Sequence, residues 1–248
     1  MDNPIVTYHE NGNIHTETYL KNYHYRENDK PAWISYYENG NIKYEIYYIN
    51  NQYHRDDDKP AYICYYENGN IQYERYYIHH QCHRENDKPA IICYYENGNI
   101  KSEQYWVNHK HHRENDKPAY ISYYPSESGN GENRNIQSEE YWVNHRYDRD
   151  NDKPAYISYY ENGNIQSENF YIKNQRHRDN DKPSIIEYDI NGNITSEKYW
   201  LNGKCERLNP DYPTIIEYKK DGSDVVNIFT DENGKELRRK EIFGVWNK

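Results

Sequence analysis

Short runs in which apolar and polar residues alternate recur along this chain of 248 residues, and Asn-Gly turns separate them. Residues 153–176 are representative, because Ala155, Ile157 and Tyr159 occupy alternate positions before the turn at 161–164 and a second run follows it. Alternation with a period of two is typical of β-strands, and Asn-Gly between two such runs is a strong signal for a β-hairpin. Since no segment has the 3.6-residue period of an amphipathic helix, the pattern predicts an all-β fold.

The hairpin belongs to a longer repeat that an arginine marks. Six copies of Arg-(Glu/Asp)-(Asn/Asp)-Asp-Lys-Pro occur, and a seventh at 207–213 is degenerate. The interval is 29 residues except for one of 36, and the arginines are Arg26, Arg55, Arg84, Arg113, Arg149, Arg178 and Arg207. Such a period predicts an elongated, single-layer array of about seven antiparallel β-hairpin units, each of which buries its face against its neighbours.

These observations suggest how the chain is divided. We assign residues 1–209 to the tandem repeats, the first of which is partial, and residues 210–248 to a divergent C-terminal capping unit. The longer interval results from an insertion at 125–135, which we expect to be a surface loop. A second turn near Asn50 and its equivalents closes each unit into a meander, and the turn at 231–234 predicts a last hairpin.

Comparison of the copies within the chain separates two faces of the first strand. Ala, Ile and Tyr are nearly constant at the first, third and fifth positions after proline, which share one face. The second and fourth positions vary. We therefore expect the constant face to be packed and the variable face to be available. With the tryptophans that follow the second strand, the candidate interaction face comprises Trp33, Tyr62, Tyr120, Tyr156, Trp106, Trp142 and Trp200.

Charged residues are as regular as the apolar ones. We interpret them as a ladder of Glu, Arg and Tyr hydroxyl groups that satisfy one another along the sheet, with Glu74, Glu103, Glu168, Arg84, Arg113 and Arg178 as its members. A catalytic site is normally a single asymmetric constellation, whereas here each residue recurs about seven times. We therefore expect no enzyme activity and no cofactor.

Two patterns resemble metal sites. The acidic segments lack the spacing of a calcium loop. Histidine and cysteine, which are metal ligands, fall together in one turn, but their equivalents in the next repeat would lie about 10 Å away, too far to share an ion. We expect no metal, and the weak candidate is the cluster His79, His80, Cys82 and His83.

Composition narrows the classes of partner. Only 34% of the residues are hydrophobic while 32 are tyrosine, so any core must be built largely from tyrosine. The net charge of -10 disfavours nucleic acid. The chain shows no signal peptide and no run of 18 apolar residues, so we expect a cytoplasmic protein that is neither secreted nor bound to a membrane, with its four cysteines reduced.

The segments 94–106 and 112–119 resemble the MORN-variant repeats of the YwqK-type antitoxin-like family, and the resemblance covers about residues 5–205. Similar tandem copies occur in proteins of amoeba-infecting giant viruses. That resemblance implies a repeat ribbon located in the host cytoplasm or associated with the virus particle. The repeat type does not specify a function.

The sequence thus favours a non-enzymatic repeat protein that offers a surface for protein–protein interaction or scaffolding. Two alternatives remain open. One is a structural, virion-associated component that assembles with itself, and the other is carbohydrate binding through exposed aromatic side chains.

Overall fold

The computed structural model describes residues 3–19, 29–126, 135–149, 151–219 and 224–243, and these residues form strands and turns without a helix. The predicted all-β fold of antiparallel hairpins is therefore confirmed. The chain separates into two compact units, residues 1–113 with 122–134 and residues 114–121 with 135–248. Most of the predicted insertion, residues 127–134, lies outside the described residues, as do Arg26 and Trp246.

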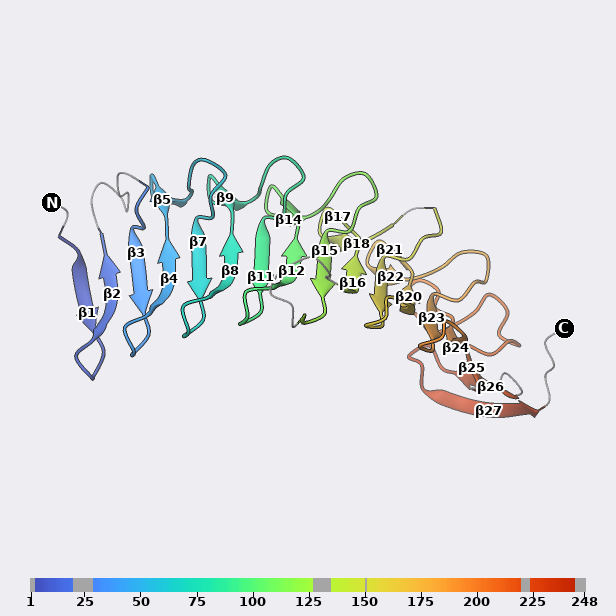
Figure 1. Ribbon diagram of the computed structural model, residues 1–248. Coiled ribbons are helices and arrows are strands. Elements are labelled where there is room, and N and C mark those ends of the chain that lie inside the picture. The colour runs from blue at the N-terminus through green and yellow to red at the C-terminus, as the bar shows by residue number, and fades with distance from the viewer. Residues whose placement is uncertain (1–2, 20–28, 127–134, 150, 220–223, 244–248) are drawn as a thin grey trace. The chain divides into compact units, whose positions relative to one another are not determined.

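Unit 1 contains a continuous antiparallel sheet in which each strand pairs with the next one named (Figure 1). Its strands are β1 (Ile5–Tyr8), β2 (Ile14–Thr18), β3 (Trp33–Tyr36), β4 (Ile42–Ile46), β7 (Tyr62–Tyr65), β8 (Ile71–Arg75), β11 (Ile91–Tyr94) and β12 (Ile100–Gln104). β15 (Tyr120–Tyr123) has residues in both units.

Unit 2 continues the same pattern with its own antiparallel strands. They are β16 (Ile136–Glu140), β19 (Tyr156–Tyr159), β20 (Ile165–Asn169), β23 (Ile185–Tyr188), β24 (Ile194–Lys198), β25 (Ile215–Tyr218), β26 (Asp224–Thr230) and β27 (Glu236–Phe243). β26 and β27 pair across the turn at 231–234, so the last predicted hairpin is confirmed. The Tyr218 hydroxyl of β25 still donates to Glu197, as in the repeats, and the boundary at 209–210 stays a prediction.

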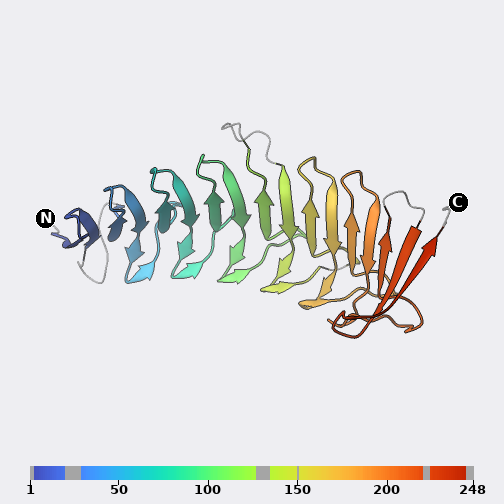
Figure 2. The ribbon, with the colours of Figure 1, turned by 90° about the horizontal axis from the view of Figure 1, so that it is seen from below.

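In five of the described repeats the second turn forms a small hairpin that is a separate two-stranded sheet, whereas the turn at 202–203 closes only an isolated bridge between Leu201 and Lys204. The two turn residues of each small hairpin have positive φ, for example 51° at Asn50 and 63° at Asn51, as tight hairpin turns require. Figure 2 shows these hairpins as a second row beside the main strands. They are β5 (Tyr48–Ile49) with β6 (Gln52–Tyr53), β9 (Tyr77–Ile78) with β10 (Gln81–Cys82), β13 (Trp106–Val107) with β14 (Lys110–His111), β17 (Trp142–Val143) with β18 (Arg146–Tyr147), and β21 (Tyr171–Ile172) with β22 (Gln175–Arg176).

The small hairpins fold over the variable face of the main strands. Trp142 Nε1 and the Tyr147 hydroxyl both donate to the Glu140 carboxylate, at 2.9 and 2.7 Å. Glu140 lies on the variable face, since it is the register partner of Tyr156. The small hairpins therefore cover the variable face, and the alternation of residues along the main strands does not predict this cover.

This cover overturns the expectation that variable positions are available. Ser35, Ser122 and Ser158, at the fourth position, are 2%, 7% and 8% exposed, so they are at least as buried as Ile63 on the constant face, which is 8% exposed. Trp33, Tyr62, Tyr120 and Tyr156 at the second position are half-buried. The small residues at the fourth position and the aromatic residues at the second position pack together under the small hairpins. The residue type can vary at these positions because different combinations fill the same space.

Candidate functional site

The charged motif that recurs in the repeats forms a loop that returns from the small hairpin to the next main strand. Its turn residues adopt left-handed backbone conformations, with φ of 62° at Asn86 and 54° at Asp87. Asn and Asp tolerate this region better than other residues with a Cβ atom, which explains why the motif carries them before Lys88. Proline follows the lysine, and the next strand begins two residues later, as Pro89 and Ile91 show.

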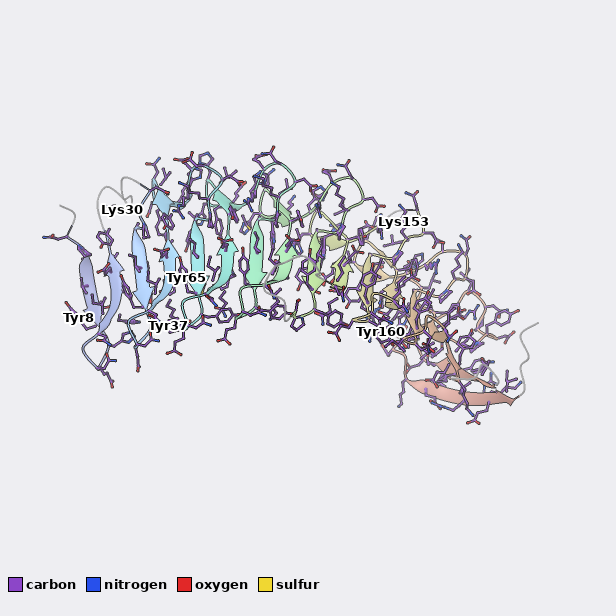
Figure 3. The ribbon with its side chains drawn as sticks, viewed as in Figure 1. Tyr8, Lys30, Tyr37, Tyr65, Lys153 and Tyr160 are labelled. Carbon is purple, nitrogen blue, oxygen red and sulfur yellow. The ribbon has the colours of Figure 1, made fainter. Side chains whose placement is uncertain are left out.

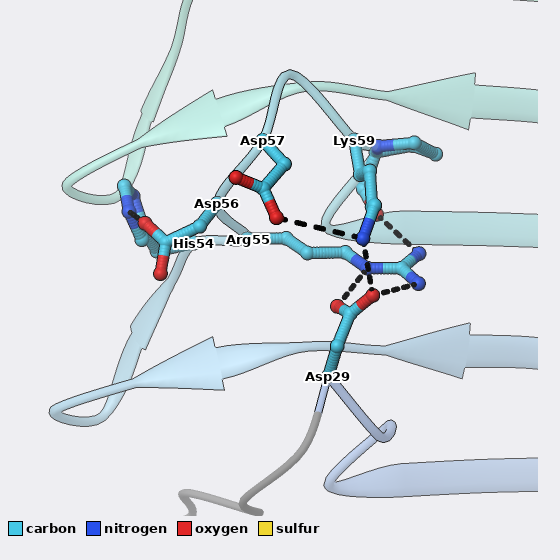
Figure 4. Close-up of polar contacts among 7 residues, drawn as sticks. Asp29, His54, Arg55, Asp56, Asp57 and Lys59 are labelled. Carbon is cyan, nitrogen blue, oxygen red and sulfur yellow. Dashed lines mark hydrogen bonds and ion pairs between the residues drawn. The ribbon is translucent and has the colours of Figure 1, made fainter.

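Each loop is fastened to the loop of the preceding repeat through one aspartate. Arg84 donates from Nε and Nη2 to the two oxygens of Asp58, at 2.7 and 3.2 Å, and Lys88 Nζ donates to the same carboxylate at 2.6 Å. The Arg84 guanidinium also lies 3.6 Å from the centre of the Tyr76 ring. We call this arrangement the Arg–Asp–Lys clip; Figure 4 shows its equivalent around Asp29.

The clip recurs in both units. The arginines pair with the Asp that lies before Lys in the preceding motif: Arg55 with Asp29, Arg113 with Asp87, Arg149 with Asp116, Arg178 with Asp152, and Arg207 with Asp181. The predicted ladder is corrected here, because the arginines bind these aspartates and not the glutamates. The bidentate fork of arginine matches a carboxylate and leaves its face free for stacking.

The clip changes the acidity of its aspartates. Hydrogen bonds from Arg, and to a smaller extent from Lys, lower the pKa to about 2 for four aspartates: Asp29, Asp58, Asp116 and Asp152. Hydrogen bonding to the charged form stabilises that form against the cost of burial. The clips are therefore intact ion pairs throughout the physiological pH range.

Tyrosine hydroxyls and glutamates make the second connection between repeats. The Tyr94 hydroxyl donates to Glu74 at 2.8 Å, Tyr123 to Glu103 at 2.6 Å, and Tyr188 to Glu168 at 2.7 Å. Burial and this carboxylate raise the pKa of Tyr94 and Tyr188. In Figure 3, Tyr65 lies within the sheet among such neighbours, while Tyr37 and Tyr160 lie toward the turn edge.

The cluster considered for a metal is dispersed. The His79 ring stacks on His54 with 5.1 Å between centroids, and the His80 ring stacks on Tyr53 at the same distance. Cys82 is 4% exposed, and burial raises the pKa of its thiol to about 12. His83 Nε2 contacts Glu85 at 2.9 Å. Among the residues that the structure describes, no three metal-ligand side chains converge.

Four aromatic residues of the candidate interaction face, Trp33, Tyr62, Trp106 and Trp142, contact other rings, and Trp200 contacts an arginine. Trp142 lies 3.8 Å from Tyr147, and Trp106 lies 4.6 Å from His111, measured between ring centroids. Tyr62 stacks between Tyr44 and Tyr73, the Trp33 ring lies against Tyr44, and Arg176 lies over Trp200. Their rings serve packing, and a role in binding stays a prediction.

Open grooves lie between successive clips, and the sequence analysis did not identify them. A groove of about 220 Å³ lies between the loops 54–59 and 83–86, with the segment 76–78 in its lining. One of about 270 Å³ lies between residues 148–149 and 151–153 on one side and the loop 177–182 on the other, and residues 170–172 line it. The sequence feature that could have indicated the grooves is the triplet of two aromatic residues and one aliphatic residue that precedes each second turn.

The grooves combine an apolar floor with walls that carry charges of both signs. Ile172 is 38% exposed in one groove. The walls carry carboxylates that reach into solvent: Asp57 is 80% exposed, Asp56 73% and Glu85 69%. An apolar floor between fixed polar groups is typical of binding sites.

Comparison with known proteins identifies the repeat. The family described as MORN repeat variant matches residues 32–50, 61–79, 91–108 and 155–173. MORN repeats form a non-enzymatic family and generally interact with proteins or membranes. No curated protein matches the chain. Within the described ranges, no helix is long and apolar enough to cross a membrane. In four of its repeats the chain is therefore similar to the MORN repeat variant.

Proposed function

We propose that this protein is a non-enzymatic scaffold whose grooves bind an extended segment of another protein. The observation that supports this function is the recurrence of one groove, with an apolar floor and charged walls, at equivalent places in successive repeats. The constant polar residues join the repeats to one another, so the grooves are the surface that remains for a partner. We place this function in the cytoplasm, of the host cell or in association with a particle if the protein is viral.

The repeat geometry limits what a partner segment looks like. Two main strands per repeat, each about 4.8 Å from the next, place equivalent grooves about 10 Å apart within a unit. A polyproline II segment rises about 3.1 Å per residue and presents every third side chain on one face, a spacing of about 9 Å. A segment with apolar side chains at every third position therefore fits successive grooves.

Charge supports a basic partner. The exposed carboxylates of the walls, Asp56, Asp57 and Glu85, and the net charge of -10 attract lysine and arginine side chains. Rim charges of this kind mainly accelerate association and impose a salt dependence. We expect basic residues between the apolar anchors of the partner.

Selection from a displayed peptide library against the full chain tests this function. The expected result is an enriched set of peptides with apolar residues three positions apart and intervening Lys or Arg. Their binding should weaken about tenfold in Ile172→Glu, because the apolar contact is lost and a charged carboxylate would have to be desolvated beneath the apolar anchor of the peptide. The control is Ile190→Glu, since Ile190 is 54% exposed outside the groove. Selection of acidic peptides, or equal binding by both variants, would contradict the proposal.

A further inference from the structure

Among the strands that the structure describes, β1 has a neighbour on one side only. Within these strands it pairs only with β2, whereas each main strand from β2 to β11 (β2, β3, β4, β7, β8 and β11) pairs on both sides. Ile5 and Tyr8 of β1 are 56% and 62% exposed. An exposed strand edge is a template for pairing with another chain, and β1 carries none of the charges or prolines within its four residues that usually prevent it.

Tyr8 is the one member of its series without the partner that the others have. At the same repeat position, Tyr36 donates to Glu17 of the preceding repeat, Tyr65 to Glu45, and Tyr94 to Glu74. Tyr159, Tyr188 and Tyr218 repeat the contact in unit 2. Within the described residues, the Tyr8 hydroxyl makes no such bond, and Figure 3 shows it at the free end of unit 1.

The internal repeats show which strand would complete this edge. On the equivalent strand β3, the preceding strand places Glu17 opposite Ile34, Thr18 opposite Trp33, and the Tyr19 N–H on the Ala32 carbonyl. If a strand paired with β1 in the same register, its glutamate would lie opposite Val6 and within reach of Tyr8. An aromatic residue would follow that glutamate two positions later. We infer that the β1 edge binds an antiparallel strand of a protein partner that carries Glu-x-aromatic.

The other end of the same chain does not meet this requirement. Asn227 pairs with Ile216, and Lys240 pairs with Asn227, so Lys240 occupies the row in which the repeats carry glutamate. Arg238, whose guanidinium lies 3.9 Å from the centre of the Phe229 ring, precedes Lys240 by two residues and would lie opposite Tyr8 if Lys240 lay opposite Val6. An end-to-end contact between two copies would therefore oppose Tyr8 with a cation, and the partner is a different polypeptide.

A peptide taken from the chain itself provides the probe. A labelled peptide with the sequence of residues 99–106 contains Glu103 and Tyr105 in the required order. We expect it to bind the full chain and to slow hydrogen exchange of the β1 amides. The same peptide with Glu103→Leu should bind about tenfold more weakly, because the charge-assisted bond to Tyr8 is lost.

Matched variants of the protein locate the site. Tyr8→Phe should weaken peptide binding about tenfold, while Tyr212→Phe should not, since Tyr212 is 54% exposed elsewhere. The groove variant Ile172→Glu should bind the peptide normally, so this inference stands or fails separately from the proposed function. Equal affinity of both peptides, equal affinity of Tyr8→Phe, protection of β27 in place of β1, or self-association through β1 would each overturn it.

Discussion

At the scale of single residues, the repetition of charge is explained by contacts between neighbours. Arg84 is 14% exposed because it lies flat on Tyr76 while it holds Asp58. The sequence predicted that Arg, Glu and Tyr act together, but it paired arginine with the wrong acid. Both acids recur with the same period, so spacing alone does not tell which one lies within reach of Arg84.

The clip requires arginine and not merely a positive charge. Arg84→Lys removes the two-pronged contact with Asp58 and the stacking on Tyr76, and we expect the free energy of unfolding to fall by about 1.5 kcal/mol. Urea unfolding followed by circular dichroism measures this change. Arg146→Lys is the control, because Arg146 lies exposed on a small hairpin. Equal stability of the two variants would show that Arg84 contributes only charge.

The contact between Tyr188 and Glu168 should be cooperative. Tyr188→Phe and Glu168→Gln each weaken one hydrogen bond of 2.7 Å and should cost about 1 kcal/mol. In the double variant the losses should not add, with a coupling of about 1 kcal/mol, as a double-mutant cycle from thermal or urea unfolding would reveal. Additive losses would mean that the two side chains act independently.

At the scale of elements, the main hairpins could be predicted from the sequence, whereas the folding of the small hairpins over them could not. Asn-Gly turns and alternation are local signals, and Gly69, with φ of 90°, occupies the turn where they place it. The folding of the small hairpins over the variable face depends on contacts such as Trp142 with Glu140, which join residues of different elements. The grooves were missed for the same reason, since their two walls come from successive repeats.

Acid should loosen the connections between loops. The clip lowers the pKa of Asp58 and Asp152 to about 2 from an ordinary value of 3.8, so the unfolded chain binds protons first as the pH falls. The stabilisation is complete above about pH 4 and is lost progressively toward pH 2. Urea midpoints measured between pH 6 and pH 2.5 should fall across this window.

The double variant Asp58→Asn and Asp152→Asn provides the control for this titration. It should be less stable than the natural chain at pH 6 and should lose less stability on acidification, because two of the linked carboxyls are gone. Parallel pH profiles for the two proteins would assign the acid sensitivity to other groups.

At the scale of the whole molecule, stability should be distributed through nearest neighbours. Each repeat is joined to the next by one clip and one contact between tyrosine and glutamate, as Arg178 with Asp152 and Tyr188 with Glu168 illustrate. Arrays of this kind gain their stability from each unit and its immediate interfaces. Damage should therefore remain close to its origin.

Hydrogen exchange can follow this locality. Arg178→Ala should lower the protection of amides in β19, β20 and β23, which lie beside its clip, and leave β3 and β4 unchanged. Pulsed exchange of the full chain, followed by digestion with pepsin and mass spectrometry of the peptides, resolves these segments. Equal loss of protection in all strands would indicate that the chain unfolds as one cooperative body.

The central claim is that the grooves between clips hold a protein partner. The most direct test is quantitative capture from cell extract with three forms of the purified chain: the natural form, Ile172→Glu and Ile190→Glu. The account predicts at least one protein that the natural chain and Ile190→Glu retain and that Ile172→Glu loses. An identical set of captured proteins for all three forms would contradict it.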